Sequence, residues 1–246
     1  MNWLFHLGRY WIFIKDLMTR PEKFSIYWKQ FVRELDNFGY GSLGIVALVS
    51  VFMGAVITIQ TVYNLVNPLI PMSAVGIVAR DSIILEFSPT MISLVLAGKI
   101  GSSIASEIGT MRVTEQMDAL QVMGINPASY LVLPKIGASL LFFPVLVIFS
   151  IFMGLLGGYL AGDWLHLVNP ESFLTGYFDE FRPYYVVYSL TKTVVFAFII
   201  SSISAWYGFN VKGGAVEVGK ASTKAVVAMS FSIILFNYIL TDVMLQ

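Results

Sequence analysis

The sequence predicts an all-α polytopic membrane protein with an N-terminal interfacial helix, five transmembrane helices, and a short surface helix between the second and third spans. Composition is the first observation: 57% of the 246 residues are hydrophobic and only 12% are charged, about half the charged share of soluble domains. Five apolar stretches are the second, each long enough for the roughly 20 residues that a spanning helix needs. The third is a charged run at residues 107–120, which lies between two such stretches and therefore belongs at a membrane surface.

Residues 1–34 are predicted to form an amphipathic helix on the membrane, separate from a transmembrane domain over residues 35–246. Aromatic and basic side chains alternate here, as in Trp11 near Arg9 and Trp28 beside Lys29. Aromatic rings favour the headgroup level of a bilayer, and Lys and Arg reach anionic lipid. Pro21 is expected to break this helix into two pieces. A soluble N-terminal extension is the alternative.

The apolar stretches define five spans in order. The first contains no charged residue, whereas the second contains Arg80, Asp81, Glu86 and Lys99. The predicted spans cover residues 38–66, 73–106, 130–161, 184–207 and 222–245. The segments between them are predicted as a turn at 67–71, a polar loop at 162–183 and a glycine-rich linker at 208–219.

The basic residues predict the orientation of these spans. With the N-terminus in the cytoplasm, 12 of the 15 Lys and Arg residues fall on the cytoplasmic side, and only Arg80, Arg182 and Lys192 fall on the other. Cytoplasmic loops of membrane proteins carry the excess of Lys and Arg. The run at 107–120 and the 208–219 linker are therefore also predicted to be cytoplasmic.

Small residues recur every four positions near the end of the second span, and a glycine stripe at 154–162 resembles them. Small residues at this spacing allow two helix backbones to approach closely in lipid. The stripe predicts tight helix packing, either within the chain or at a seam between two copies. Its members are Ala97, Gly101, Ala105 and Gly109.

Glu86 is a carboxylate within an apolar stretch, three residues before Pro89. An intramembrane carboxylate costs a few kcal/mol or more, so it is expected to face a cavity, a partner or water. One hypothesis is that it holds a polar headgroup through hydrogen bonds or a bridging cation. The alternative is a structural glutamate beside the backbone that Pro89 perturbs. Lys99, near the end of the span, is a second lipid-binding candidate, although it can also snorkel.

The run at 107–120 is predicted to be one helix. Its charged residues Arg112, Glu115 and Asp118 follow at intervals of three, so on a regular helix they project mainly to one side. Gly124 with Asn126 and Pro127 ends it before the third span. A docking helix for a soluble partner is favoured over a solvated loop.

Nothing in the sequence resembles a catalytic or metal site. The chain has no cysteine, and its two histidines, His6 and His166, lie far apart. It contains no phosphate-binding Walker A loop, no HExxH zinc motif and no GxSxG nucleophile elbow. If ATP drives this protein, another chain binds the ATP and its magnesium. The net charge of zero gives no indication of nucleic-acid binding.

Several motifs together resemble the MlaE-type permease family of lipid-transporting ABC systems. They are Ala97 to Ser102, Glu107 to Met111, Thr114 to Leu120, and Asn126-Pro127. A second similar stretch begins at Gly208 and continues from Gly213 to Val227. The similarity covers roughly residues 35–245. Such a permease is expected to be a homodimer with a lipid cavity between its protomers.

The resemblance also implies partners and site residues. The expected partners are an ABC ATPase, which binds ATP and magnesium, a periplasmic MCE-domain protein, and a small STAS-type regulator. The surface helix would dock in a groove of the ATPase. The residues expected to couple the two chains are Glu107, Arg112, Glu115, Gln116, Asp118 and Leu120.

The family's Arg-Glu-Leu-Gly-Pro element near the lipid cavity corresponds to residues 85–89. Glu86 and Pro89 are kept, but the arginine is Leu85 and the glycine is Ser88. Arg80 is a possible substitute for that arginine, although on a regular helix its side chain points elsewhere. Lys99 replaces a second family arginine and loses bidentate recognition of phosphate. Acyl chains also need an apolar lining, for which Val56, Ile59 and Val62 are the candidates.

The predicted function is therefore that of a non-catalytic permease subunit, in a bacterial inner membrane, of an ABC transporter for phospholipid. One alternative is an ion-coupled secondary carrier in which Glu86 titrates, but the expected inverted repeats are not evident. The other is a membrane-embedded enzyme acting on lipids. It requires several polar residues at one depth, whereas Glu86 is expected to stand nearly alone.

Overall fold

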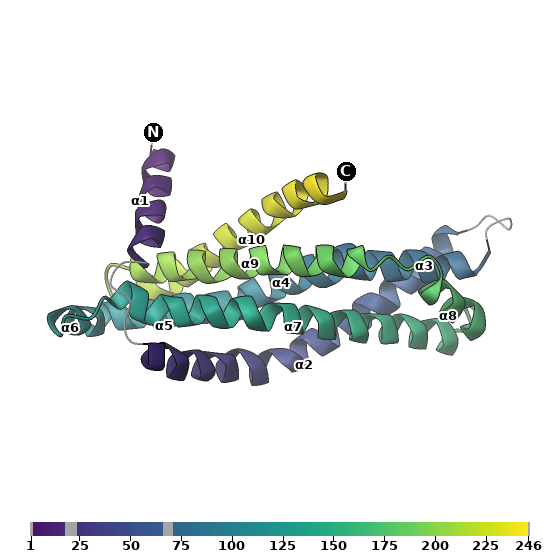
Figure 1. The fold of residues 1–246 in the computed structure, drawn as a ribbon, viewed down its shortest axis with the longest axis horizontal. Helices are drawn as coiled ribbons and strands as arrows, with labels where there is room; N and C mark the ends of the chain where they lie inside the picture. The colour runs from purple at the N-terminus through teal and green to yellow at the C-terminus, as the bar shows by residue number, and fades with distance from the viewer. Residues whose placement is uncertain (1, 18–23, 66–70, 246) are drawn as a thin grey trace. The chain divides into compact units, whose positions relative to one another are not determined.

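The computed structural model describes residues 2–17, 24–65 and 71–245 (Figure 1), and these form helices without any strand. Five helical segments are long and apolar enough to cross a membrane, which confirms the predicted fold class. The spanning segments are Tyr27–Asn64, Ser73–Val113, Pro127–Trp164, Tyr184–Phe209 and Ala215–Leu245. They correspond to α2 (Phe24–Asn64), a composite second span, α7 (Pro127–Trp164), α9 (Tyr184–Phe209) and α10 (Ala215–Leu245).

The N-terminal region differs from the prediction at one boundary. α1 covers Asn2–Leu17, and α2 then continues from Phe24 to Asn64 as one helix, through the expected boundary between residues 34 and 35. α2 contains no proline, and the glycines that follow the boundary, Gly39 and Gly41, lie within the helix without ending it. The break expected at Pro21 and most of the turn at 67–71 lie outside the described residues.

The second span is composite rather than a regular α-helix. α3 (Ser73–Ser82) leads into the π-helical segment η1 (Ile83–Met91), followed by α4 (Ile92–Leu96), a second π-helical segment η2 (Ala97–Gly101) and α5 (Ser102–Val113). Pro89 lies inside η1. Proline has no N–H for the regular helical hydrogen bond, and its ring clashes with the preceding turn, so the backbone widens locally. Glu86 is therefore placed by a π-helical backbone.

The chain forms two compact units, and α2, α7, α9 and α10 each contribute residues to both. The first unit comprises Met1–Tyr40, Leu96–Phe142 and Val195–Phe236, and the second comprises Gly41–Val95, Phe143–Val194 and Asn237–Gln246. The division follows contacts in space rather than chain order.

Glycines bring α2 and α7 together in the second unit. A Cβ added at Gly54 would lie 1.9 Å from the carbonyl oxygen of Gly154, and one added at Gly157 would lie 2.2 Å from that of Val51. Only glycine allows such an approach. The sequence left open whether the 154–162 glycines pack within the chain or against a second copy. At Gly154 the structure shows packing within the chain.

The loop predicted at 162–183 contains a helix, α8 (Pro170–Phe178), which the sequence analysis missed. The buried guanidinium of Arg80 lies at its end and donates hydrogen bonds to the carbonyl oxygens of Gly176, Tyr177 and Asp179 at 3.4, 3.0 and 2.6 Å. The last carbonyls of a helix have no partner within it. Arg80 therefore caps α8 and holds it to α3, so it is not available beside Glu86.

In the first unit, the small-residue stripe of η2 and α5 packs against α9 and α10. A Cβ at Gly101 would meet Met229 and Ile200, and a Cβ at Gly109 would meet Val218 and Val211. Ala97 and Ala105 are likewise fully buried. The stripe is thus occupied by contacts within the chain, and a seam between two copies at these residues stays a prediction.

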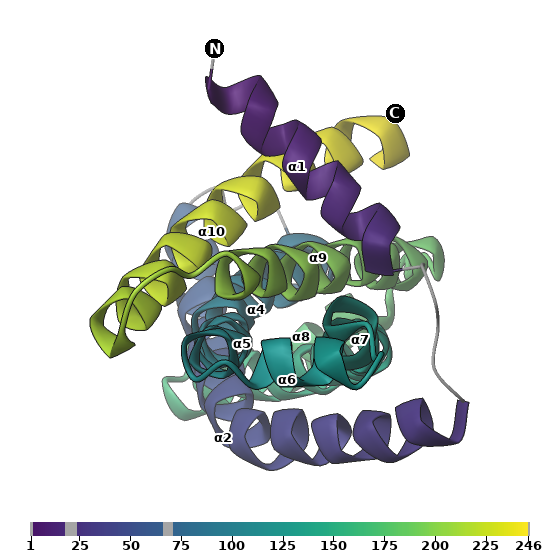
Figure 2. The same ribbon diagram turned by 90° about the vertical axis from the view of Figure 1, so that its left-hand side faces the viewer.

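α1 crosses α9 in the same unit (Figure 2). Tyr10 donates a hydrogen bond to Ser202 at 2.7 Å, and the buried Phe13 ring lies 5.4 Å from both Trp206 and Phe209. Burial raises the pKa of the Tyr10 hydroxyl above its ordinary value, so this group stays a donor at neutral pH. α1 is therefore anchored to α9 by one aromatic cluster and one hydrogen bond.

We expect Gly54→Ala to destabilise the chain because its Cβ would overlap the backbone of α7. Overpacking of this kind costs about 1–3 kcal/mol. The matched control is Gly44→Ala on the same helix, where no atom lies within 4 Å of the added Cβ. Thermal unfolding in detergent should show a lower melting temperature for Gly54→Ala alone, and equal values would contradict the close α2–α7 approach.

Candidate functional site

A cluster of polar side chains surrounds Glu86 in the second unit. Glu86 and Thr90 come from η1, Tyr188 and Lys192 from α9, and Asn237 and Thr241 from α10. The Glu86 carboxylate is its centre, because four of the other five side chains bind it directly. Three membrane-spanning segments therefore meet at one polar site.

Lys192 forms the strongest contact of this cluster. Its ammonium nitrogen lies 2.7 Å from Oε1 of Glu86 and 3.4 Å from the carbonyl oxygen of Leu85. The nitrogen also lies 4.4 Å from the centre of the Tyr188 ring, within the range of a cation–π interaction. The Lys192 side chain is 0% exposed. A buried ammonium requires such partners, since desolvation of an unpaired charge costs several kcal/mol.

Hydroxyl and amide groups supply the remaining contacts of the carboxylate. The second oxygen of Glu86 accepts hydrogen bonds from Asn237 Nδ2 at 3.1 Å and Thr90 Oγ1 at 3.3 Å. Thr241 Oγ1 lies 3.4 Å from the first oxygen and is also bonded to Tyr188 at 2.9 Å. These bonds favour the charged carboxylate, so the site holds an ion pair within a polar shell.

The two members of the ion pair differ in accessibility. The Glu86 side chain is 42% exposed in this chain, whereas Lys192 is completely covered. A molecule that approaches the site therefore meets the carboxylate, Asn237 and the threonine hydroxyls, and not the ammonium group. The site is suited to a ligand that donates hydrogen bonds or carries a positive charge.

The expectation that Glu86 stands nearly alone was wrong. Its partners come from spans four and five, which lie 106 and 151 residues away in sequence for Lys192 and Asn237. One signal was present: Lys192 is the single charged residue between Tyr184 and Phe209, and an intramembrane cation usually pairs with another polar group. The family has an arginine beside this glutamate where this chain has Leu85, and here Lys192 provides the positive charge next to Glu86.

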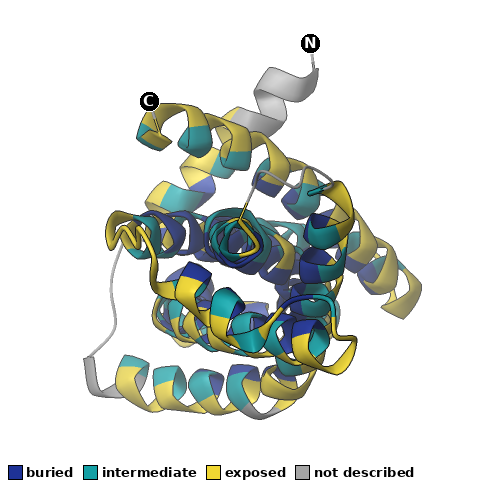
Figure 3. Ribbon diagram, turned by 90° about the vertical axis from the view of Figure 1, so that its right-hand side faces the viewer, coloured by how far each residue is buried: buried dark blue, intermediate teal, exposed yellow. Residues whose placement is uncertain are grey.

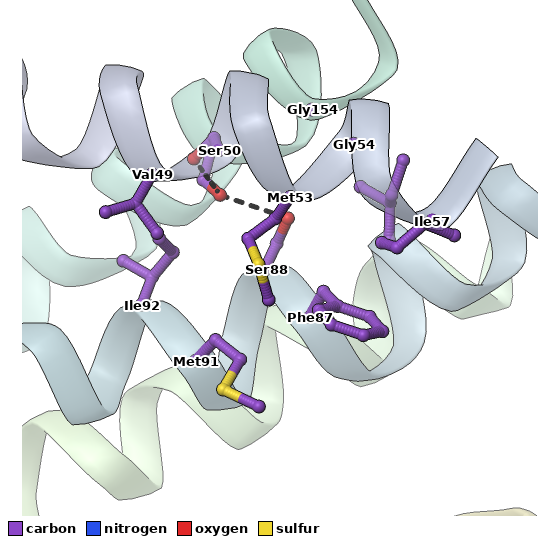
Figure 4. A pocket seen from close by; sticks show the side chains of 12 residues that line it. Val49, Ser50, Met53, Gly54, Ile57, Phe87, Ser88, Met91, Ile92 and Gly154 are labelled. Carbon is purple, nitrogen blue, oxygen red and sulfur yellow. Dashed lines mark hydrogen bonds between the residues drawn. The ribbon is translucent and has the colours of Figure 1, made fainter. Parts of the chain in front are cut away.

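A small cavity lies near the cluster, between α2, η1 and α7 (Figure 4). Its volume of about 10 Å³ has room for roughly one water molecule and is far too small for an acyl chain. Ser50 donates to Ser150 at 2.8 Å, and Ser150 donates to Ser88 at 3.1 Å, so a chain of hydroxyl groups joins the three helices. Ser88, where the family has glycine, is used in this packing.

The other predicted lipid contacts lie outside this cavity. Val56, Ile59 and Val62 do not line it; Val56 is exposed, and Val62 packs partly against a core cluster that contains Ile57. Lys99 lies on η2 in the first unit, and its ammonium group has no hydrogen-bond partner among the described residues. The roles of these four residues stay predictions.

The run at 107–120 was predicted to be one helix, and this prediction was wrong. α5 ends at Val113, Glu115 has a left-handed backbone (φ 60°), and a separate helix, α6, covers Gln116–Val122. The β-branched pair Val113 and Thr114 has low helix propensity. The charged side chains therefore do not follow a single helical face.

The turn between α5 and α6 instead brings two of the charged side chains together. Arg112 and Asp118 form an ion pair at 2.8 Å across the turn, while Glu115 and Gln116 are exposed. Leu120 is half-buried and Met117 is buried, so Val122 and Met123 are the large apolar side chains that α6 and its end expose. A docking surface here comprises a polar turn followed by two apolar residues.

Glu107 is a half-exposed carboxylate that pairs with a second buried lysine. The Lys135 ammonium, with its side chain 3% exposed, lies 2.7 Å from Glu107 and 2.6 Å from Glu34. These residues belong to α5, α7 and α2. Glu107 thus links α5 to the two neighbouring helices just before the turn that leads to α6.

Comparison with known proteins identifies the family. The family model described as Permease MlaE matches residues 31–243, which is most of the chain. The chain belongs to the MlaE permease family. It is 37% identical over 236 residues to a probable ABC transporter permease protein of Rickettsia bellii, covering 96% of this chain and 91% of that protein.

Two further relatives come from photosynthetic organisms. The probable ABC transporter permease protein slr1045 of Synechocystis is 35% identical over 215 residues, covering 87% of this chain and 81% of that one. The protein TRIGALACTOSYLDIACYLGLYCEROL 1, chloroplastic, of Arabidopsis thaliana is 33% identical over 231 residues, with coverage of 94% and 66%. This MlaE-family chain is accordingly a multi-pass permease subunit of an ABC transporter, and membership implies an ATPase partner. It argues against the stand-alone carrier and the membrane-embedded enzyme.

We expect Glu86→Leu to destabilise this permease because Lys192 would keep a buried charge without its acceptor, at a cost of about 3 kcal/mol. The double variant Glu86→Leu/Lys192→Met removes both charges and should recover at least half of that loss. Lys99→Met, which removes an intramembrane lysine without such a pair, is the control. Melting temperatures in detergent provide the measurement, and a double variant no more stable than Glu86→Leu would contradict the pairing.

Proposed function

We propose that this permease subunit moves phospholipid between a bacterial inner membrane and a periplasmic MCE-domain partner. The observation that carries the proposal is the half-exposed Glu86 carboxylate over the covered Lys192 ammonium, within membrane-spanning helices. Exposed charge in a span is costly unless it meets a cavity or a polar ligand. A lipid headgroup meets that need, and the name of the Arabidopsis relative also refers to a glycerolipid.

The donors and acceptors of the site favour a headgroup with ammonium or hydroxyl groups. Glu86 accepts hydrogen bonds, and Asn237 and Thr90 offer further polar atoms beside it. The Lys192 charge balances the carboxylate, so the site as a whole is neutral. A zwitterionic or hydroxyl-bearing headgroup enters such a site without leaving a net charge in the membrane.

The acyl chains require an apolar surface, which a second copy of the chain would help to enclose. α10 is the least buried of the five spans, and much of it is exposed (Figure 3). It also contributes Asn237 and Thr241 to the Glu86 cluster. We place the lipid cavity between two protomers, next to α10, with Val56, Ile59 and Val62 as apolar contacts and Lys99 as a further headgroup contact.

The ATPase partner would bind ATP and magnesium and dock on α6. Glu115, Gln116 and Asp118 are exposed there. Movement of α6 would reach the second span directly through α5, and the third and first spans through the Glu107–Lys135–Glu34 network. Arg112 and Leu120 would hold the turn and α6 in their docking geometry. The short helix is thereby coupled to the spans that form the lipid site.

The orientation and remaining partners complete the proposal. The distribution of Lys and Arg supports a cytoplasmic N-terminus, with α1 on the inner leaflet and α6 facing the ATPase. The MCE-domain protein would then lie over the periplasmic ends of the spans. A small STAS-type regulator would act from the ATPase side.

We expect Glu86→Gln to reduce lipid transport about tenfold or more while leaving the complex assembled. The amide keeps an oxygen for Lys192 but loses the charge that strengthens a headgroup hydrogen bond, an effect of about 1.5–3 kcal/mol. Transfer of fluorescent phospholipid by the chain reconstituted with its ATPase provides the measurement. Glu171→Gln, an exposed carboxylate on α8, is the control, and wild-type transport in Glu86→Gln would leave Glu86 a purely structural role.

We expect Glu115→Lys/Asp118→Lys to reduce recovery of the ATPase with the tagged chain at least fivefold, since both changes reverse charge on the docking turn. Asp163→Lys/Glu171→Lys makes the same charge change at the end of α7 and the start of α8 and should retain the ATPase. Glu115→Gly should reduce recovery less than the double variant does, because glycine accepts the left-handed backbone and the change removes one charge without reversing it. Equal recovery in all four proteins would place the docking surface elsewhere.

A further inference from the structure

A second polar pocket lies in the first unit, between α1, the end of α9 and the start of α10. Its volume is about 470 Å³, in the range of small-ligand sites. Four of its lining residues are basic, and only Glu217 is acidic, which gives an excess of three positive charges. The basic residues are Arg9, Lys212, Lys220 and Lys224.

The four basic residues of the pocket differ in the contacts that they make among the described residues. Lys220 forms an ion pair with Glu217 at 2.7 Å, and Arg9 donates to Asn210 at 3.0 Å and lies 5.7 Å from the centre of the Trp206 ring. The ammonium groups of Lys212 and Lys224 have neither a hydrogen bond nor an ion pair within the described part of the chain. Lys224 also acts on the Glu217 carboxylate through its charge. With one acidic residue for four basic ones, the pocket keeps an excess of positive charge for an anion.

Exposed apolar side chains lie on two of the three helices that line the pocket. Trp11 and Ile12 of α1 are each 69% exposed, and Val216 of α10 is 72% exposed. Basic groups next to exposed aromatic and aliphatic side chains are typical of segments at the headgroup level of a bilayer. Trp206, which also lines the pocket, meets the rings of Tyr10 and Phe13 edge to face.

We propose that this pocket binds the phosphate group of an anionic phospholipid from the leaflet in which α1 lies. Lys212 and Lys224 hold the phosphate, Arg9 adds a third positive charge, and the acyl chains extend along the exposed apolar side chains of α1 and α10. The bound lipid joins α1 to the α9–α10 connection. The site is separate from the Glu86 cluster and does not rest on the transport of lipid.

Native mass spectrometry of the full chain in detergent tests the proposal with phosphatidylglycerol as probe and phosphatidylcholine as the neutral comparison. We expect Lys212→Gln/Lys224→Gln to weaken phosphatidylglycerol binding about tenfold or more. The control Lys15→Gln/Lys29→Gln removes two exposed lysines outside the pocket and should retain binding. All these side chains are exposed, so the melting temperatures should be equal. Equal binding in the two double variants would overturn the proposal.

Two further arms identify the source of the phosphate and the class of ligand. Inorganic phosphate should not displace phosphatidylglycerol at equal concentration, because it has no acyl chains; efficient displacement would overturn a lipid as the occupant. Recovery of the ATPase with Lys212→Gln/Lys224→Gln should match the wild type. Loss of the ATPase with lipid binding intact would make the pocket a protein contact and would also overturn the proposal.

Discussion

The pairing of buried charge in a low-dielectric environment is the constraint on which much of this structure depends. Arg80, Lys135 and Lys192 are all buried, and each would destabilise its helix without a partner. Arg80 binds the carbonyl oxygens at the end of α8, Lys135 joins Glu34 and Glu107, and Lys192 joins Glu86. Arg80 thus fixes the position of α8, Lys135 fixes those of α5 and α2, and Lys192 fixes that of η1. The requirement for pairing turns three otherwise costly residues into the links between segments that are far apart in sequence.

Irregular backbone and charge pairing meet at Glu86. Pro89 cannot complete the regular helical hydrogen bond four residues back, which involves the carbonyl of Leu85, and that oxygen lies within 3.4 Å of the Lys192 ammonium. One lysine therefore serves both the altered backbone and the carboxylate. Because Lys192 is covered and Glu86 is not, the pair has a structural side and an accessible side. The two hypotheses for Glu86, structural support and ligand contact, are consequently compatible at one residue.

Much of the fold could be predicted from the sequence because the spans depend on local composition. Each apolar stretch contains enough residues to cross a bilayer, so the five spans follow without knowledge of their neighbours. The ends of the helices were less predictable: the helical run at 107–120 breaks at Glu115 through a single left-handed residue, and α8 depends on a cap from Arg80, 96 residues away from Gly176 in sequence. The partners of Glu86 were missed for the same reason. Their meeting is a property of packing between spans, and a lone lysine in one apolar stretch does not specify which carboxylate it will meet.

The Glu107 network shows how a family motif can have a structural role and a functional one together. Glu107 belongs to the stretch that resembles the family's docking region, yet its carboxylate is held by Lys135, which also holds Glu34. A force on α6 acts on a turn that Arg112 and Asp118 close, at the end of the helix that this network binds to α7 and α2. Exposed ion pairs such as Arg112–Asp118 contribute little to stability and rearrange at low cost, whereas the buried Lys135 ammonium resists losing its acceptors because an unpaired buried charge is costly. The turn is accordingly the compliant part and the network the rigid part, which is the arrangement needed to transmit a displacement rather than absorb it.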